Sequence, residues 1–145
     1  MAHEVSLVLR NSLSEIPRIA DTVERFFEVN NLPTAVEMHV TLALDEMATN
    51  AISYGFKDGV VMDEAITIHL KLKENELVAV IEDYGRSFNP LSVSPPDTEL
   101  GLDAREIGGL GVHFARKFMT HVVYQRIDGM NRLTMRKALE YHPKA

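Results

Sequence analysis

The sequence contains no cysteine and no long hydrophobic run. Without cysteine, neither a disulfide framework nor a thiolate metal site can form, and a reducing compartment is allowed. No stretch reaches the roughly 18 consecutive apolar residues that a membrane-spanning helix needs. The amino terminus also lacks a basic region followed by an apolar run, which is the pattern of a signal peptide. These absences predict a soluble, cytoplasmic protein with no membrane partner.

Basic residues are also scarce relative to acidic ones. The chain carries 15 Lys and Arg against 21 Asp and Glu, which gives a net charge of −6. An acidic balance disfavours general binding to nucleic acid or to an anionic membrane surface, because both repel negative charge. The length of 145 residues is that of one ordinary domain with a proper core. We therefore expect a single domain over residues 1–145, with no direct nucleic-acid partner.

The amino-terminal part predicts a strand and then a helix. Residues 3–10 alternate between apolar and polar side chains, as a half-buried strand does. Apolar residues then recur at helical spacing over residues 16–27, with Ser12 or Ser14 as the cap and Pro17 in the first turn.

A second, longer helix is predicted from Thr34 to about residue 51. Thr34 and Glu37 have the spacing of a capping box, and apolar residues continue at helical spacing beyond them. A polar loop with two glycines follows over residues 55–64.

The remaining segments predict a sheet. Residues 65–73 alternate, while residues 77–81 are continuously apolar, which predicts a central strand buried on both faces. Residues 86–108 contain three prolines and no clear period, so they form a long loop of the kind that often serves as a lid. A glycine-led helix follows, and strands at 122–127 and 130–136 then flank a hairpin turn. This order predicts a mixed or antiparallel sheet with helices packed on one face.

Three short motifs have the chemistry of a ligand site. Glu46 and Asn50 share one face of the second helix among small and apolar neighbours. A carboxamide oxygen can bind a hard cation such as Mg²⁺, and a nearby carboxylate can take a proton or order a water. The alternative is a solvated polar stripe on the helix.

The second motif, Asp83-Tyr84-Gly85, ends the predicted central strand. A carboxylate there can accept a hydrogen bond from an exocyclic amine, and Gly85 lets a flat ligand approach the backbone. The third motif is Gly108-Gly109-Leu110-Gly111, whose N–H groups open a helix and favour a phosphate. Either motif alone is also compatible with an ordinary turn. The glycines follow a proline-bearing loop rather than a buried strand, which disfavours a dinucleotide fingerprint.

Together and in this order, the three motifs resemble the N, G1 and G2 boxes of the ATP-binding fold shared by gyrase, the heat-shock chaperone of that class, histidine kinases and a mismatch-repair ATPase. Within that superfamily, residues 44–52, 83–90 and 109–112 most resemble the small stand-alone anti-sigma-factor serine/threonine kinases of bacteria. The resemblance covers almost the whole chain. It implies the Bergerat (GHKL) fold, an α+β two-layer sandwich with a mixed, mostly antiparallel sheet, helices on one face and an ATP lid at about residues 86–108.

The resemblance also implies the role of each residue. Asn50 would hold Mg²⁺ at the triphosphate of ATP, and Glu46 would act as general base towards a substrate hydroxyl or water. Asp83 would accept from the adenine amino group, and Gly85 would give space for the ring. The remaining nucleotide contacts implied are Gly109, Leu110 and Gly111 at the phosphates and Thr134 at the adenine end, through water.

One position departs from the family pattern. Some of these kinases carry an arginine two residues before the glycine-x-glycine, where it can meet the γ-phosphate, but Ile107 stands there in this chain. Arg105 is the nearest arginine, and Arg86 is a substitute; the alternative for both is a surface salt bridge. Asp45 and Thr49 either support the Glu46 and Asn50 pair or belong to a solvated helix flank.

The function that the resemblance implies is a regulatory kinase with ATP and Mg²⁺ as cofactors. It would bind a sigma factor or another output protein and phosphorylate Ser or Thr on a small antagonist, an anti-anti-sigma protein. A homodimer is suggested by the resemblance alone. Three alternatives stay open: an ATP-dependent partner-binding switch without transfer activity, an ATP hydrolase in which Glu46 activates water, and a domain with a structural role only.

Overall fold

The computed structural model describes residues 3–92 and 110–139. Within these residues, five strands form one sheet in the order β1-β2-β3-β5-β4, and every pair of neighbours is antiparallel. The strands are β1 Glu4–Leu9, β2 Ile66–Lys73, β3 Glu76–Asp83, β4 His121–Ile127 and β5 Met130–Ala138. The helices are α1 Pro17–Val29, α2 Thr34–Tyr54 and α4 Leu110–Phe118, with short 3-10 turns at Leu13–Glu15 and Pro90–Ser92.

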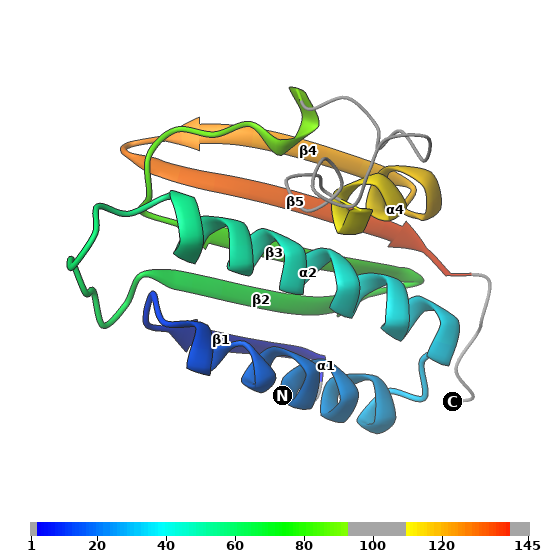
Figure 1. The fold of residues 1–145 in the computed structure, drawn as a ribbon. Helices are drawn as coiled ribbons and strands as arrows, with labels where there is room; N and C mark the ends of the chain where they lie inside the picture. The colour runs from blue at the N-terminus through cyan, green and yellow to red at the C-terminus, as the bar shows by residue number, and fades with distance from the viewer. Residues whose placement is uncertain (1–2, 93–109, 140–145) are drawn as a thin grey trace.

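The described helices cover one face of the sheet, as predicted (Figure 1). The long helix α2 crosses the middle of that face, with α1 on the β1 side and α4 on the β4–β5 side. The core lies between the two layers, where Leu44 of α2 is fully buried together with Ile68 of β2 and Leu133 of β5. None of the helices in the described part of the chain combines the length and apolar character of a membrane span.

Strand β3 is central in the sheet, but it differs from the prediction in one respect. Its residues alternate between half-buried and buried, so only the face under the helices is closed off from solvent. Val78 and Val80 lie on the other, uncovered face and are half-buried there. The apolar residues of β3 on the outer face are therefore only partly shielded from solvent, and the described helices do not cover that face.

The helix starts also differ from the predicted caps. The residue before α2 is Pro33, and Thr34 is already helical, so no side chain caps this end. The Glu37 N–H donates to the Pro33 carbonyl at 3.1 Å instead of to a threonine hydroxyl. At α1, Ile16 takes the cap position without a side-chain bond, while Pro17 does occupy the first turn as predicted.

The turn between β4 and β5 follows the prediction. Asp128 has a φ of 50° and Gly129 a φ of 80°, the left-handed pair that a tight two-residue hairpin requires. Strand pairing runs from Ile127 with Met130 at the turn to His121 with Arg136 at the far end. The turn therefore fixes the register between β4 and β5.

Candidate functional site

A pocket of about 350 Å³ lies where the carboxyl-terminal half of α2 meets the end of β3 and the start of β5. Its volume is at the lower end of the range for small-molecule sites. The pocket contains side chains from both ends of the predicted site, Asn50 and Asp83. The complete lining is Met47, Asn50, Ala51, Tyr54, Gly55, Asp83, Arg86, Phe88 and Asn131.

On the α2 side, Glu46 and Asn50 form the pair that their spacing predicted. The Asn50 Nδ2 donates to the Glu46 Oε2 at 3.1 Å, and both side chains are half-buried. Because the nitrogen end of the amide is engaged by the carboxylate, the Oδ1 end remains available to a cation. Asn50 lines the pocket, whereas Glu46 stands one helical turn away and reaches it through Asn50.

Asp83 is the buried carboxylate of the pocket, with 7% of its surface exposed. Its Oδ1 accepts hydrogen bonds from the Gly85 N–H at 2.9 Å and from Asn131 Nδ2 at 3.0 Å. Burial raises the pKa of Asp83, and the bonds from Asn131 and Gly85 and the Arg126 charge partly oppose that rise. With Oδ1 occupied in this way, Oδ2 is the acceptor left for a ligand.

Gly85 has a structural reason to be glycine. A Cβ at this position would lie 2.9 Å from the Asp83 Oδ1 and 2.9 Å from the Gly55 carbonyl oxygen. The next N–H, of Arg86, donates to that same Gly55 carbonyl at 2.8 Å. Gly85 therefore lets the chain after β3 pack directly on the end of α2. The sequence analysis predicted only that Gly85 gives space for a flat ligand, and it did not predict this packing role.

Asn131 is the site residue that the sequence analysis missed. It lies opposite Asp83 in the pairing of β3 with β5, and 7% of its surface is exposed. Its signal was present in the sequence as a polar residue at the start of β5, on the same face as the apolar Leu133 and Met135. That signal identifies a site only when the register of β3 and β5 is known, because the two residues are 48 positions apart.

Thr134 was expected at the adenine end, and the structure contradicts this. Successive side chains of a strand point to opposite faces. In β5, Asn131, Leu133 and Met135 are buried beneath the helices, so Thr134 points to the uncovered face. Thr134 does not line the pocket, and the inward position that meets Asp83 is three residues earlier in the strand.

The predicted phosphate contacts are only partly described. Gly109 and Arg105 lie outside the described residues, as does most of the predicted lid at residues 86–108. Leu110 and Gly111 form the start of α4, so the helix begins where the glycine motif predicted. Arg86 is exposed and lines the pocket, and it forms no ion pair within the described residues, in contrast to the surface salt bridge considered for it.

Asp45 behaves differently from a solvated flank. Its Oδ1 is buried and has no hydrogen-bond partner among the described residues, and burial raises the pKa of this carboxyl. A carboxyl oxygen without a partner favours the protonated form, because charge is costly away from water. Asp45 and Thr49 do not line the pocket, so a supporting role for them stays a prediction.

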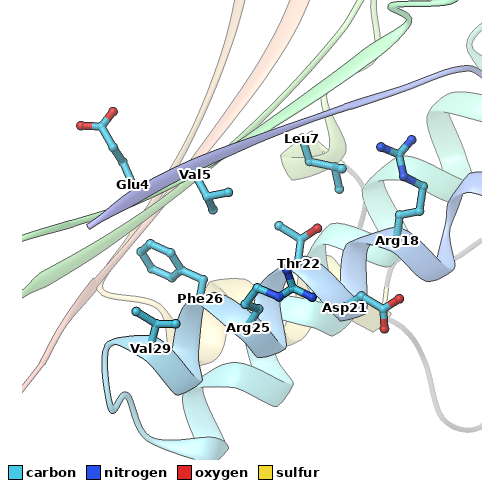
Figure 2. Close-up of a pocket in the computed structure, with 9 residues that line it drawn as sticks. All are labelled: Glu4, Val5, Leu7, Arg18, Asp21, Thr22, Arg25, Phe26 and Val29. Carbon is cyan, nitrogen blue, oxygen red and sulfur yellow. The ribbon is translucent and has the colours of Figure 1, made fainter. Parts of the chain in front are cut away.

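A second hollow of about 480 Å³ runs between β1 and α1, far along the sheet from the first. Figure 2 shows Val5 and Leu7 of β1 pointing towards α1, with Phe26 pointing back at them. Its charged lining residues are Glu4, Arg18, Asp21 and Arg25. Among the described residues that line this hollow, none is a buried polar side chain, whereas Asp83 and Asn131 are buried polar residues that line the smaller pocket. We therefore assign the candidate site to the smaller one.

The residues of the smaller pocket fit a nucleotide with a hard cation. Asn50 offers an amide oxygen beside a carboxylate, and Asp83 offers a buried acceptor shaped by Gly85. Within the described ranges, no three His, Cys, Asp or Glu side chains are grouped to hold a metal ion. A cation at Asn50 would therefore take further ligands from phosphate oxygens and water, which is how Mg²⁺ is commonly held.

Comparison with known proteins gives a consistent result. Residues 9–137 match the family model of the histidine kinase-like ATPase domain. The serine/threonine-protein kinase BtrW of Bordetella bronchiseptica is 35% identical over 98 residues. The aligned part covers 66% of this chain and 66% of that protein, just under two thirds of its length.

Two solved structures share the fold. The RsbU and RsbW domains of Rv1364c from Mycobacterium tuberculosis superpose with a TM-score of 0.66 at 13% identity, over 94% of this chain and 32% of that one. A chain of the SiaB-SiaC complex from Pseudomonas aeruginosa gives a TM-score of 0.58 at 13% identity, over 93% and 89%. At this identity the likeness concerns the arrangement of helices and strands alone.

Proposed function

Because the chain belongs to the histidine kinase-like ATPase domain family, we propose that it is an ATP-binding regulatory serine/threonine protein kinase. In this proposal it acts as an anti-sigma factor, and its substrate is a small antagonist, an anti-anti-sigma protein. The observation that carries the proposal is the convergence of Asn50 and Asp83 on one pocket. The likeness to a serine/threonine kinase at 35% identity supports the same conclusion.

The nucleotide is oriented by Asp83. Its free Oδ2 accepts from the exocyclic amine of adenine, while Oδ1 is kept in place by Gly85 and Asn131. A guanine presents a carbonyl at the corresponding ring position, so this acceptor discriminates between the two bases. The triphosphate would then extend towards Asn50, and the N–H groups of Gly109, Leu110 and Gly111 are its proposed phosphate contacts.

Asn50 is the metal ligand in this proposal. Its Oδ1 would hold Mg²⁺, which when bound neutralises charge on the phosphate oxygens. The Glu46 carboxylate keeps the amide turned with the oxygen outward, because it accepts from the Nδ2 end. Loss of that hydrogen bond would allow the amide to rotate and would weaken the cation site.

Glu46 is the proposed general base. It would take the proton from a Ser or Thr hydroxyl of the antagonist as the oxygen of that hydroxyl bonds to the γ-phosphorus and ADP leaves. The sigma factor and a second copy of the chain are further proposed partners, on the family resemblance alone. We also propose that residues 1–145 form a single domain and that Arg105 contacts the γ-phosphate.

The first experiment measures Mg²⁺-dependent ATP binding by calorimetry on the native protein and on Asn50→Ala and Asp83→Asn. We expect Asp83→Asn to weaken binding by about 100-fold, because it replaces an acceptor by a group that also donates. Asn50→Ala should remove the dependence on Mg²⁺. If the folded native protein binds no ATP, the proposal is wrong.

The second experiment follows transfer of the γ-phosphate to a cognate antagonist. Glu46→Gln should keep ATP affinity within about threefold and lower transfer by about 100-fold or more, because it retains the bond to Asn50 but cannot accept a proton. Glu24→Gln, an exposed site on α1, is the matched control. ATP binding without transfer by the native protein would indicate the partner-binding switch, and steady phosphate release without a partner would indicate the hydrolase.

A further inference from the structure

The side-chain amide of Asn131 makes four hydrogen bonds. Its Nδ2 donates to the Asp83 Oδ1 at 3.0 Å and to the Arg86 carbonyl at 2.9 Å. Its Oδ1 accepts from the Phe88 N–H at 3.3 Å and from the Tyr124 hydroxyl at 2.5 Å. The orientation of the amide follows from its partners, since the two acceptors face the nitrogen and the two donors face the oxygen.

These four bonds use the full capacity of a carboxamide. An asparagine side chain has two N–H donors and two acceptor lone pairs. All of them are occupied by the protein, so Asn131 has none left for a ligand although it lines the pocket. Its function must therefore be exerted through the groups that it holds.

The groups that Asn131 holds belong to two parts of the site. One is the carboxylate of Asp83, and the other is the backbone of residues 86–88, where the predicted lid begins. Arg86 and Phe88 also line the pocket. The same segment is fixed from two further directions, because Arg126 Nη1 donates to the Gly85 carbonyl at 2.9 Å and the Arg86 N–H donates to the Gly55 carbonyl at 2.8 Å.

We propose that Asn131 is a positioning residue that couples recognition of the base by Asp83 to the conformation of residues 86–88. A ligand that fixes the Asp83 carboxylate also fixes the Asn131 amide, and through it the Arg86 carbonyl and the Phe88 N–H. The Tyr124 hydroxyl supplies one of the two bonds to the Asn131 Oδ1, and the Phe88 N–H supplies the other, so the bonds of Nδ2 to Asp83 and Arg86 do not depend on Tyr124. The proposal rests on the proposed function in one respect, that the ligand at Asp83 is a nucleotide.

The test compares native protein with Asn131→Ala, Asn131→Asp and Tyr124→Phe. Asn131→Ala removes all four bonds, and Asn131→Asp keeps the acceptor end while losing both donors. Tyr124→Phe is the matched control, since it removes one bond and leaves Asp83 and Arg86 held. The ligands are ADP and GDP with Mg²⁺, which avoid turnover. The measurements are both dissociation constants and amide hydrogen exchange of residues 84–92.

We expect ADP to slow exchange of residues 84–92 in the native protein and to bind more tightly than GDP. In Asn131→Ala and Asn131→Asp the preference for ADP over GDP should fall by about 10-fold, because the hydrogen bond to a charged acceptor is lost. The slowing of exchange by ADP should disappear in both. Tyr124→Phe should retain both properties within about threefold. A merely structural role would weaken both nucleotides equally and leave the preference unchanged.

The proposal is overturned if folded Asn131 variants keep the preference for ADP and its effect on exchange. It is also overturned if Asn131→Ala fails to fold and Asn131→Asp behaves as the native protein. Failure of the proposed function is distinguishable, because the native protein would then bind neither nucleotide. In that case exchange in the free protein decides: faster exchange of residues 84–92 in Asn131→Asp supports the positioning role, and equal exchange overturns it.

Discussion

At the scale of single residues, the ability of the pocket to accept a hydrogen bond depends on the protonation state of Asp83. Burial raises its pKa above the ordinary value of 3.8, against the opposing effects of Asn131, Gly85 and Arg126. A protonated carboxyl would present a donor at Oδ2 to the adenine amine, which is also a donor. If Asp83 accepts from the adenine amine as proposed, binding requires its ionised form, and the raised pKa brings the loss of that form closer to neutral pH.

We predict that ATP affinity falls as the pH is lowered from neutral. The fall should begin at a higher pH than the value of about 3.9 at which an ordinary aspartate titrates. Calorimetry at a series of pH values from neutral to about 4 measures the affinity. A raised folded-state pKa means that Asp83 favours folding at low pH, and this contribution is lost as the pH rises through that pKa. Acid therefore weakens binding without destabilising the fold through this group. Affinity that stays constant down to the ordinary range would contradict the prediction.

At the scale of elements, the β4–β5 hairpin places much of the site. It carries Asn131 and Tyr124, and Arg126 of the same hairpin holds the Gly85 carbonyl. The register between these strands is set by the turn, in which Gly129 has a φ of 80° and open space around it. A Cβ there would meet no atom, so the cost of a side chain is backbone strain alone.

We predict that Gly129→Ala lowers the free energy of unfolding by about 1 kcal/mol, because alanine is strained at positive φ. Gly59→Ala is the matched control, since Gly59 also has a φ of 80° and open space but joins no strands. Denaturant unfolding should give similar losses for both. Only Gly129→Ala should speed amide exchange at the turn end of β4 and β5. Equal exchange in the two variants would show that the turn does not control the register.

At the scale of the whole molecule, the pocket joins segments that are distant in the sequence. Asn50 comes from α2, Asp83 from the end of β3 and Asn131 from β5. None of these segments forms the site by itself, so the unfolded chain has no affinity for the ligand. Ligand binding must then stabilise the whole fold by mass action.

We predict that Mg²⁺ with ATP at about 100 times its dissociation constant adds about 2.7 kcal/mol to the free energy of unfolding. For a chain of this size, that raises Tm by roughly 5–10 °C. Calorimetric unfolding should show one transition that moves as a unit, as a single domain requires. Asp83→Asn should unfold in the same manner without the shift. A second transition that ignores ATP would contradict the single domain.

The sequence by itself determined the helices, the strands and the pairing of Glu46 with Asn50. Glu46 and Asn50 meet because residues four apart share a helix face, which is local geometry. The position of Asp83 at the end of β3 and the Asp128-Gly129 turn are equally local, since they depend on period and turn chemistry. Helix caps were less predictable, because Pro33 and Ile16 satisfy those ends without a side-chain hydrogen bond.

Only the tertiary structure decided which side chains of β5 enter the site. A strand alternates faces, so a position is inside or outside according to its register with the neighbouring strand, and one step exchanges the two. Thr134 and Asn131 are three residues apart and therefore face opposite ways. The pairing of Asp83 with Asn131 selects the second of them, and with it the hydrogen bond from the Asn131 amide to the Asp83 carboxylate. Such long-range pairing has no local sequence signal, because it depends on how the sheet is assembled.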